Sequence, residues 1–168
     1  MKNHRIDKTE KKQESVNKPL IDDLDKDIIN ALVMDARISY AELGKKFKVS
    51  PATIHVRVEK MKRSGIITGH KLTVEPKKLG YGVCCFIGIT LKSAGDYPEV
   101  LSQLEKIDEV VEAYYTTGAY SVFTKIYCRS IDELHYLLVD KIQSIDKIRA
   151  TDTIISLQNP IDRAISLN

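Results

Sequence analysis

The amino-acid sequence predicts an α+β chain in two parts, an N-terminal winged helix-turn-helix domain of three helices and a C-terminal ferredoxin-like βαββαβ domain. Two short, well-capped helices that follow one another across a very short turn predict the first part, together with the basic charge of that half of the chain. The order of the apolar segments predicts the second part, because they read as strand, helix, strand, strand, helix and strand.

We divide the 168 residues into four segments. Residues 1–20 are almost entirely polar or charged and are expected to form a disordered arm. Residues 21–69 are assigned to the winged helix-turn-helix domain, residues 70–82 to a linker strand and residues 83–160 to the ferredoxin-like domain.

The first helix is expected to begin at Ile21 and to end near Asp35. Three aspartates lie close to its N-terminus, where carboxylates interact favourably with the helix dipole. Its apolar residues recur at helical spacing and predict one wall of a three-helix core. These residues are Leu24, Ile28, Ala31 and Leu32.

The second helix is marked by a capping box, in which Ser39 caps the helix and Glu42 reaches back to the cap. Its expected buried residues are Ala41, Leu43 and Phe47. Only two residues then separate it from the cap of the next helix, and neither is the glycine that is common in helix-turn-helix turns.

The third helix has signals at both ends. Ser50 is a favourable N-cap, Pro51 suits the first helical position, and Gly65 suits the left-handed position that follows a helix. Its apolar stripe consists of Ile54, Val58 and Met61. The opposite face is basic and rich in small residues, which is typical of a recognition helix that enters the major groove of double-stranded DNA.

The candidate DNA-binding residues all lie on this helix or at its cap. They are Ser50, Ala52, Thr53, His55, Val56, Arg57, Lys60 and Arg63. The basic residues, together with Lys62, are expected to contact phosphates, whereas Thr53, His55 and Val56 are placed to reach base edges. An ordinary surface helix with a solvated charged side is the alternative interpretation.

Residues 66–74 contain two short β-prone runs separated by glycine and basic residues, which suggests a small hairpin, or wing. In the second half, the expected strands and helices follow in order. They are a strand at 83–91, a helix opened by Tyr97 and Pro98, strands at 110–116 and 120–128, a helix with a capping box at Ser130 and Glu133, and a strand at 148–157. Because both helices cover one face of the sheet, a second copy of the chain is expected to cover the other.

Composition excludes several functional classes. The sequence has no apolar run of membrane-spanning length and a charged N-terminus without a signal-peptide pattern, which indicates a cytoplasmic protein. Its three cysteines form no metal-binding or redox motif, its four histidines are scattered, and no catalytic motif occurs. We therefore expect no enzymatic activity, no metal and no cofactor.

Charge is distributed unequally between the two halves. Residues 1–80 hold 18 lysines and arginines against 11 acidic residues, whereas residues 81–168 hold 8 against 12. A basic half joined to an acidic half suits a DNA-binding module fused to a domain that does not touch DNA.

The segment from Tyr114 to Tyr120 gathers hydroxyl groups and exposed backbone amides around one glycine. Such groups can bind the α-amino and α-carboxylate groups of an amino acid. The alternative is an ordinary β-turn, in which the glycine only provides a positive φ.

The run from Ala41 through Val49–Lys62 to Gly69 resembles the DNA-binding half of the Lrp/AsnC family, and the resemblance extends over about residues 20–160. It implies a winged helix-turn-helix, a linker strand and an effector-binding domain of the RAM/ACT-like type. The resemblance is strongest to asparagine-responsive members, which implies asparagine as the effector. It also implies that the chain controls the expression of asparagine synthetase and its own expression.

In that family, the loop at a Gly-x-Tyr/Phe motif lines an amino-acid pocket between subunits, and Gly118 to Tyr120 match this motif. Many members carry Asp next, where this chain has Ser121. The candidate effector-binding residues are Tyr115, Thr116, Thr117, Gly118, Ala119, Tyr120 and Gln143.

Relatives in that family form octamers, which implies a homodimer that assembles further, and a nucleoid-associated location. An alternative function is an amino-acid-binding regulatory subunit of a metabolic enzyme.

Overall fold

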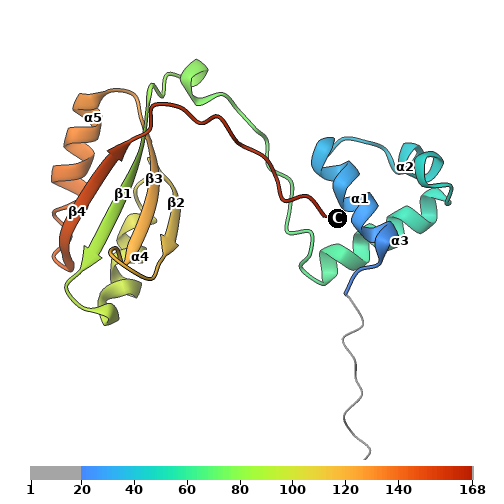
Figure 1. Ribbon diagram of the computed structural model, residues 1–168, viewed down its shortest axis with the longest axis horizontal. Coiled ribbons are helices and arrows are strands. Elements are labelled where there is room, and N and C mark those ends of the chain that lie inside the picture. Colours follow the sequence, from blue (N-terminus) through green and yellow to red (C-terminus); the bar gives the residue numbers. More distant parts are fainter. Residues whose placement is uncertain (1–19, 168) are drawn as a thin grey trace, which may run out of the picture. The chain divides into compact units, whose positions relative to one another are not determined.

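The computed structural model describes residues 20–167, so that the predicted arm lies outside the described residues except at Leu20. The chain divides into two compact units, whose helices and strands are labelled in Figure 1. Of the described residues, the first contains 20–71 and 163–167, and the second contains Leu72–Asp162. We describe each unit separately.

The first unit contains three helices, α1 (Asp23–Met34), α2 (Tyr40–Phe47) and α3 (Pro51–Arg63). Helix α1 begins two residues later than expected, after its own capping box, because the Asp22 side chain accepts a hydrogen bond from the backbone of Asp25, and the Asp25 side chain accepts one from the backbone of Asp22. The three helices enclose a small apolar core. Its buried residues are Ile28, Ala31, Leu43, Ile54, Val58 and Met61.

The capping box of α2 is confirmed, since Ser39 and Glu42 exchange hydrogen bonds of 3.2 and 2.9 Å. The prediction that Ala41 is buried is wrong. Ala41 lies two residues before the buried Leu43, a separation that places the two side chains on different faces of a helix.

The turn between α2 and α3 is closed without a glycine in the turn itself. Lys48 adopts the left-handed conformation, with φ of 57° and ψ of 40°. A glycine is needed one turn earlier, because a Cβ atom at Gly44 would lie 2.8 Å from the carbonyl oxygen of Val49 and 3.3 Å from the nitrogen of Pro51. Gly44 therefore permits the close approach of the two helices.

No wing hairpin and no linker strand form in residues 66–82, and this part of the prediction is wrong. The backbone amides of Ile66 and Ile67 donate to the carbonyl oxygen of Met61, and both side chains pack against the helical core. They therefore terminate α3 instead of starting a strand. An isolated two-stranded hairpin is marginally stable, and only a 3₁₀ helix, Pro76–Leu79, follows.

The C-terminal residues of the described chain belong to the first unit. The side-chain amide of Asn30 on α1 donates to the carbonyl oxygen of Leu167 at 2.8 Å and accepts from its backbone amide at 3.2 Å. This attachment joins positions 137 residues apart in the sequence, and no local pattern indicated it.

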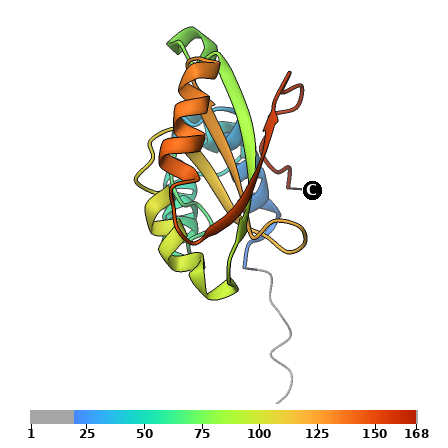
Figure 2. The same cartoon turned by 90° about the vertical axis from the view of Figure 1, so that its left-hand side faces the viewer.

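The second unit has the predicted βαββαβ order. Its strands are β1 (Val83–Leu91), β2 (Val110–Tyr115), β3 (Val122–Cys128) and β4 (Ile148–Ile155), and its helices are α4 (Tyr97–Leu104) and α5 (Ile131–Tyr136). The sheet is antiparallel with the order β2-β3-β1-β4. Figure 2 shows both helices on one face of this sheet.

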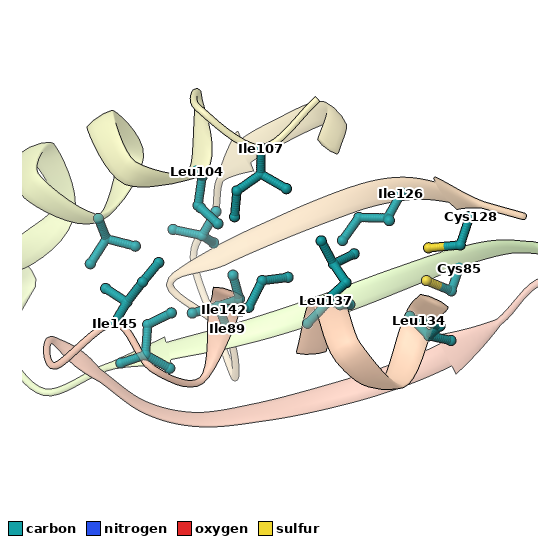
Figure 3. Close-up of a cluster of buried hydrophobic side chains, with 14 of the residues drawn as sticks. Cys85, Ile89, Leu104, Ile107, Ile126, Cys128, Leu134, Leu137, Ile142 and Ile145 are labelled. Atoms are coloured by element: carbon teal, nitrogen blue, oxygen red, sulfur yellow. The ribbon is translucent and has the colours of Figure 1, made fainter. Parts of the chain in front are cut away.

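Side chains from that face and from the two helices form the core in Figure 3. Cys85 and Cys128 lie within it as free thiols. Burial raises the pKa of Cys85 to about 11 and that of Cys128 to about 12, so both thiols stay protonated at neutral pH.

Helix α5 departs from its predicted capping box. Ser130 accepts a hydrogen bond from the backbone of Glu133, but the Glu133 carboxylate accepts from the amide of Arg129 instead of Ser130. The helix continues as a π-helical segment, Leu137–Ile142. Among residues 20–167, no helix is both long and apolar enough to span a membrane.

Candidate DNA-binding and effector-binding sites

Helix α3 turns a strip of small, apolar and basic side chains toward solvent. We call this set the outward strip, and it consists of Ala52, Val56, Lys60 and Arg63. All four are exposed, and Val56 exposes 63% of its surface. Neither the Lys60 side chain nor the Arg63 side chain has a hydrogen bond or an ion pair with another residue in the part of the chain that the structure describes. The two cations are therefore available to a ligand.

Ser50 and Thr53 lie at the start of α3 and serve its cap. The Ser50 hydroxyl accepts from the backbone amide of Thr53 at 3.0 Å, and the two hydroxyl oxygens lie 2.8 Å apart. On the side toward α2, the ring of His55 lies 5.7 Å from the ring of Tyr40. These contacts fix the residues that border the outward strip.

Lys62 pairs with Glu59 on the same helix at 2.9 Å, and this hydrogen bond lowers the pKa of the Glu59 carboxyl. Lys62 therefore has a partner within α3, unlike Lys60 and Arg63. This ion pair is exposed, where such pairs contribute little to stability and are readily exchanged for another partner.

Arg57 has a different environment from the predicted one. Its Nη1 atom lies 2.8 and 2.6 Å from the two carboxylate oxygens of Asp22 and 2.8 Å from Oδ1 of Asp25. The predicted role of Arg57 is a contact with DNA phosphates, whereas in the structure its side chain bridges α3 to the N-terminus of α1. The hydrogen bond from Arg57 is the main reason that the pKa of Asp22 is lowered.

The predicted effector loop connects β2 to β3 and is anchored on β1. Gly118 has a φ of 105°, which explains the glycine at this position. The Thr116 hydroxyl donates to the carbonyl oxygen of Tyr120 at 2.9 Å, and the Ser121 amide donates to Ile89 at 2.8 Å. The loop is therefore internally bonded, while the residues at its tip stay exposed. The exposed residues are Thr117, Gly118 and Ala119.

Tyr115 begins this loop and lies against α4. Its ring centroid is 4.2 Å from that of Tyr97, with the planes tilted by 40°. More than half of its surface remains exposed, so it forms an aromatic wall beside the loop.

Tyr120 is held by two residues that are not among the predicted site residues. Its hydroxyl donates to the Asp152 carboxylate on β4 at 2.7 Å, which raises the pKa of Tyr120. Its ring lies over Gly88 of β1, where an added Cβ atom would come within 2.6 Å of a ring carbon. A glycine inside an apolar strand is a known signal of such a close approach, although it does not identify the partner.

Gln143 lies apart from this loop within one chain. Its side-chain amide donates to the Thr151 hydroxyl on β4 at 2.8 Å. Between residues 20 and 167, no hydrogen bond links Gln143 to the loop. The structure thus gathers residues 115–120 into one loop and places Gln143 separately on the segment after α5.

The sheet face opposite α4 and α5 is aromatic. Strand alternation places Phe86 of β1 and Phe123 of β3 on this face, and their rings stack with centroids 5.7 Å apart. Tyr120 lies 6.0 Å from Phe123 on the same face. We call this surface the open face.

Within residues 20–167, no group of three or more metal-ligating side chains comes together. The two sites offer groups suited to recognition, which are cations and apolar side chains on α3 and backbone and hydroxyl groups in the loop.

Each of the two units resembles a domain of known proteins. Residues 21–62 match the family described as the AsnC-type helix-turn-helix domain, and residues 84–165 match the Lrp/AsnC ligand binding domain. Regulatory protein AsnC of Escherichia coli (strain K12) is 64% identical over 146 residues, which cover 87% of this chain and 96% of that protein.

Solved structures agree with this match. The structure of E. coli AsnC has a TM-score of 0.83 and 62% identity, and the match covers 88% of this chain and 99% of that one. A transcriptional regulator from Neisseria meningitidis, solved as a complex with L-Met, has a TM-score of 0.82 at 18% identity, with 88% and 96% of the chains covered. At that identity, the second structure supports the fold alone.

Proposed function

This chain belongs to the Lrp/AsnC family of transcriptional regulators, and on that basis we propose that it binds specific double-stranded DNA through α3 and responds to asparagine. It is a regulator with a helix-turn-helix domain and a ligand-binding domain, and it is not an enzyme. The regulatory subunit of an enzyme, considered as an alternative from the sequence, has no need of the capped, basic α3.

The outward strip is the observation that carries the DNA-binding proposal. Lys60 and Arg63 are two free cations that can neutralise phosphates, and phosphate neutralisation supplies affinity for any sequence. Val56 lies between them and the helix N-terminus as an exposed apolar side chain, which suits contact with a thymine methyl group. Thr53 and His55 flank it and are proposed to contact base edges.

Replacing Lys60 and Arg63 together by alanine is expected to weaken binding to specific and random DNA by the same factor. Each lost phosphate contact should make the slope of log affinity against log salt shallower by about 0.9. Lys106→Ala, at an exposed lysine of the second unit, is the control. Fluorescence anisotropy across a salt series measures both quantities, and an unchanged affinity of the double variant for both DNAs would refute the assignment.

The effector proposal rests on the loop of residues 115–120, whose hydroxyls and exposed amides suit the backbone groups of an amino acid. The family resemblance favours asparagine, and we propose that the chain controls its own gene and the gene for asparagine synthetase. Calorimetric titration with asparagine, glutamine, leucine and aspartate tests this. Binding of specific DNA should change the affinity for asparagine by the factor with which asparagine changes DNA affinity, typically about 5–150-fold. If none of the four amino acids gives a heat of binding, the proposed effector site is refuted.

We propose that the open face mediates a homodimer, because an aromatic sheet face needs a partner and a second copy supplies one. In the dimer, two copies of α3 can contact the two halves of a pseudo-palindromic DNA site. We propose further assembly to an octamer because members of the family that this chain resembles form octamers. DNA as the ligand favours a cytoplasmic, nucleoid-associated location. Light scattering at micromolar protein concentration measures the mass, and a monomer would contradict this assembly.

A further inference from the structure

We propose that Arg57 is a positioning residue, which fixes the angle of α3 against α1 and does not contact DNA phosphates. This inference rests on the proposed DNA binding by α3 and concerns how that helix is held. Three carboxylate oxygens lie within 2.8 Å of one guanidinium nitrogen of Arg57. The hydrogen-bonding capacity of this nitrogen is thus directed at α1.

The two carboxylates that bind Arg57 are held in place by hydrogen bonds at the N-terminus of α1. Asp22 and Asp25 form the capping box of α1, in which the Asp25 amide donates to Asp22 at 2.9 Å and the Asp22 amide donates to Asp25 at 3.2 Å. The Asp25 side chain is only 3% exposed. A buried carboxylate held in one orientation is a specific receptor for a guanidinium, and it is costly to leave without its cation.

Charge and direction both oppose a phosphate contact at this position. One guanidinium and two carboxylates leave a net negative charge, which repels a phosphate group. Arg57 follows Val56 of the outward strip by one residue, and successive residues project about 100° apart around a helix. Its side chain is 28% exposed, whereas Lys60 and Arg63 lie on the exposed face.

The consequence concerns specificity. Phosphate contacts tolerate small changes in helix angle because long cationic side chains adjust, but contacts with base edges need a fixed geometry. Arg57 is the seventh of the 13 residues of α3, so the ion-pair cluster restrains the middle of the helix. If Arg57 is released, the outward strip keeps its cations while Thr53, His55 and Val56 lose their alignment.

Arg57→Gln should therefore lower the ratio of specific to random DNA affinity by at least about tenfold, with little change in the affinity for random DNA or in its salt slope. A phosphate contact would instead lower both affinities equally and reduce the slope by about 0.9. The probes are a duplex from the region upstream of the chain's own coding sequence and a shuffled duplex of equal length and composition. Arg57→Lys, which keeps the charge, should restore part of the ratio.

Asp25→Asn provides a second test, because the two possible roles of Arg57 predict opposite changes in DNA binding for this variant. If Arg57 acts by positioning, this variant should also lower the specific-to-random ratio. If Arg57 binds phosphate, the loss of a competing carboxylate should strengthen binding to both duplexes, which would overturn the proposal. Circular dichroism and thermal unfolding show that each variant is folded at the assay temperature, and affinities are referred to the active protein fraction.

The double variant at Lys60 and Arg63 separates this inference from the proposed function. If the wild-type chain fails to discriminate between the duplexes and the double variant binds both as the wild type does, the DNA-binding role of α3 fails. If the double variant behaves as expected but Arg57→Gln leaves the specificity ratio unchanged, only the positioning role fails.

Discussion

Gly44→Val is expected to lower the free energy of unfolding of the helix-turn-helix unit by about 3 kcal/mol and to abolish specific DNA binding. The new Cβ atom would lie 2.8 Å from the carbonyl oxygen of Val49 and 3.3 Å from the nitrogen of Pro51. Both are backbone atoms of the turn, so neither can move without displacing the start of α3. Valine is a slightly better helix former than glycine, but that gain is only a few tenths of a kcal/mol.

Thermal unfolding and DNA binding measured on the same samples test this expectation. For a unit of this size, 3 kcal/mol corresponds to a fall in Tm on the order of 12–24 °C. Gly69→Val is the matched control, because it lies in the same unit and nothing lies within 4 Å of its added Cβ atom. A Gly44→Val protein with the melting temperature and DNA affinity of the control would show that the turn adapts.

Gly88→Val is expected to weaken asparagine binding by about tenfold or more, if the 115–120 loop binds it, while the first unit stays folded. The added Cβ atom would come within 2.6–2.7 Å of three carbons of the Tyr120 ring. The ring is a side chain, so it swings away and loses its hydrogen bond to Asp152. Because Tyr120 lies in the loop between β2 and β3, the loop loses this attachment to β4.

Two companion variants separate packing from hydrogen bonding. Tyr120→Phe keeps the ring over Gly88 and removes only the hydroxyl, so its effect should be smaller, about 0.5–1.5 kcal/mol in binding free energy. Gly95→Ala is the control, since the nearest atom to its Cβ is 3.9 Å away. Calorimetric titration of the three variants should give the order Gly88→Val, Tyr120→Phe, Gly95→Ala from weakest to strongest binding, and equal affinities would contradict it.

Structural features that depend on residues close together in the sequence could be predicted. The cap at Ser50, the proline after it and the stripe of Ile54, Val58 and Met61 are all confirmed, because each depends on contacts within one or two helical turns. The strand and helix order of the second unit is confirmed for a similar reason, since period and length separate strands from helices.

Features that depend on distant partners could not be predicted. Arg57 looks like any basic residue of a recognition helix until its partners, 32 and 35 residues away, are known. The isoleucines after α3 have strand propensity, yet packing against the helical core overrides it. Asp152 carried no local signal, and Gly88 indicated a close approach without indicating Tyr120.

The hydrogen bonds between Asn30 and Leu167 give the DNA-binding unit a second tether. The chain leaves this unit after Lys71 and rejoins it at Arg163, so the ligand-binding unit is an insertion within a discontinuous domain. Two hydrogen bonds contribute about 1–3 kcal/mol in total, so α1 gains stability from a residue 137 positions away in the sequence. Truncation before Leu167 should therefore lower the free energy of unfolding of the DNA-binding unit although it removes no residue of the three helices.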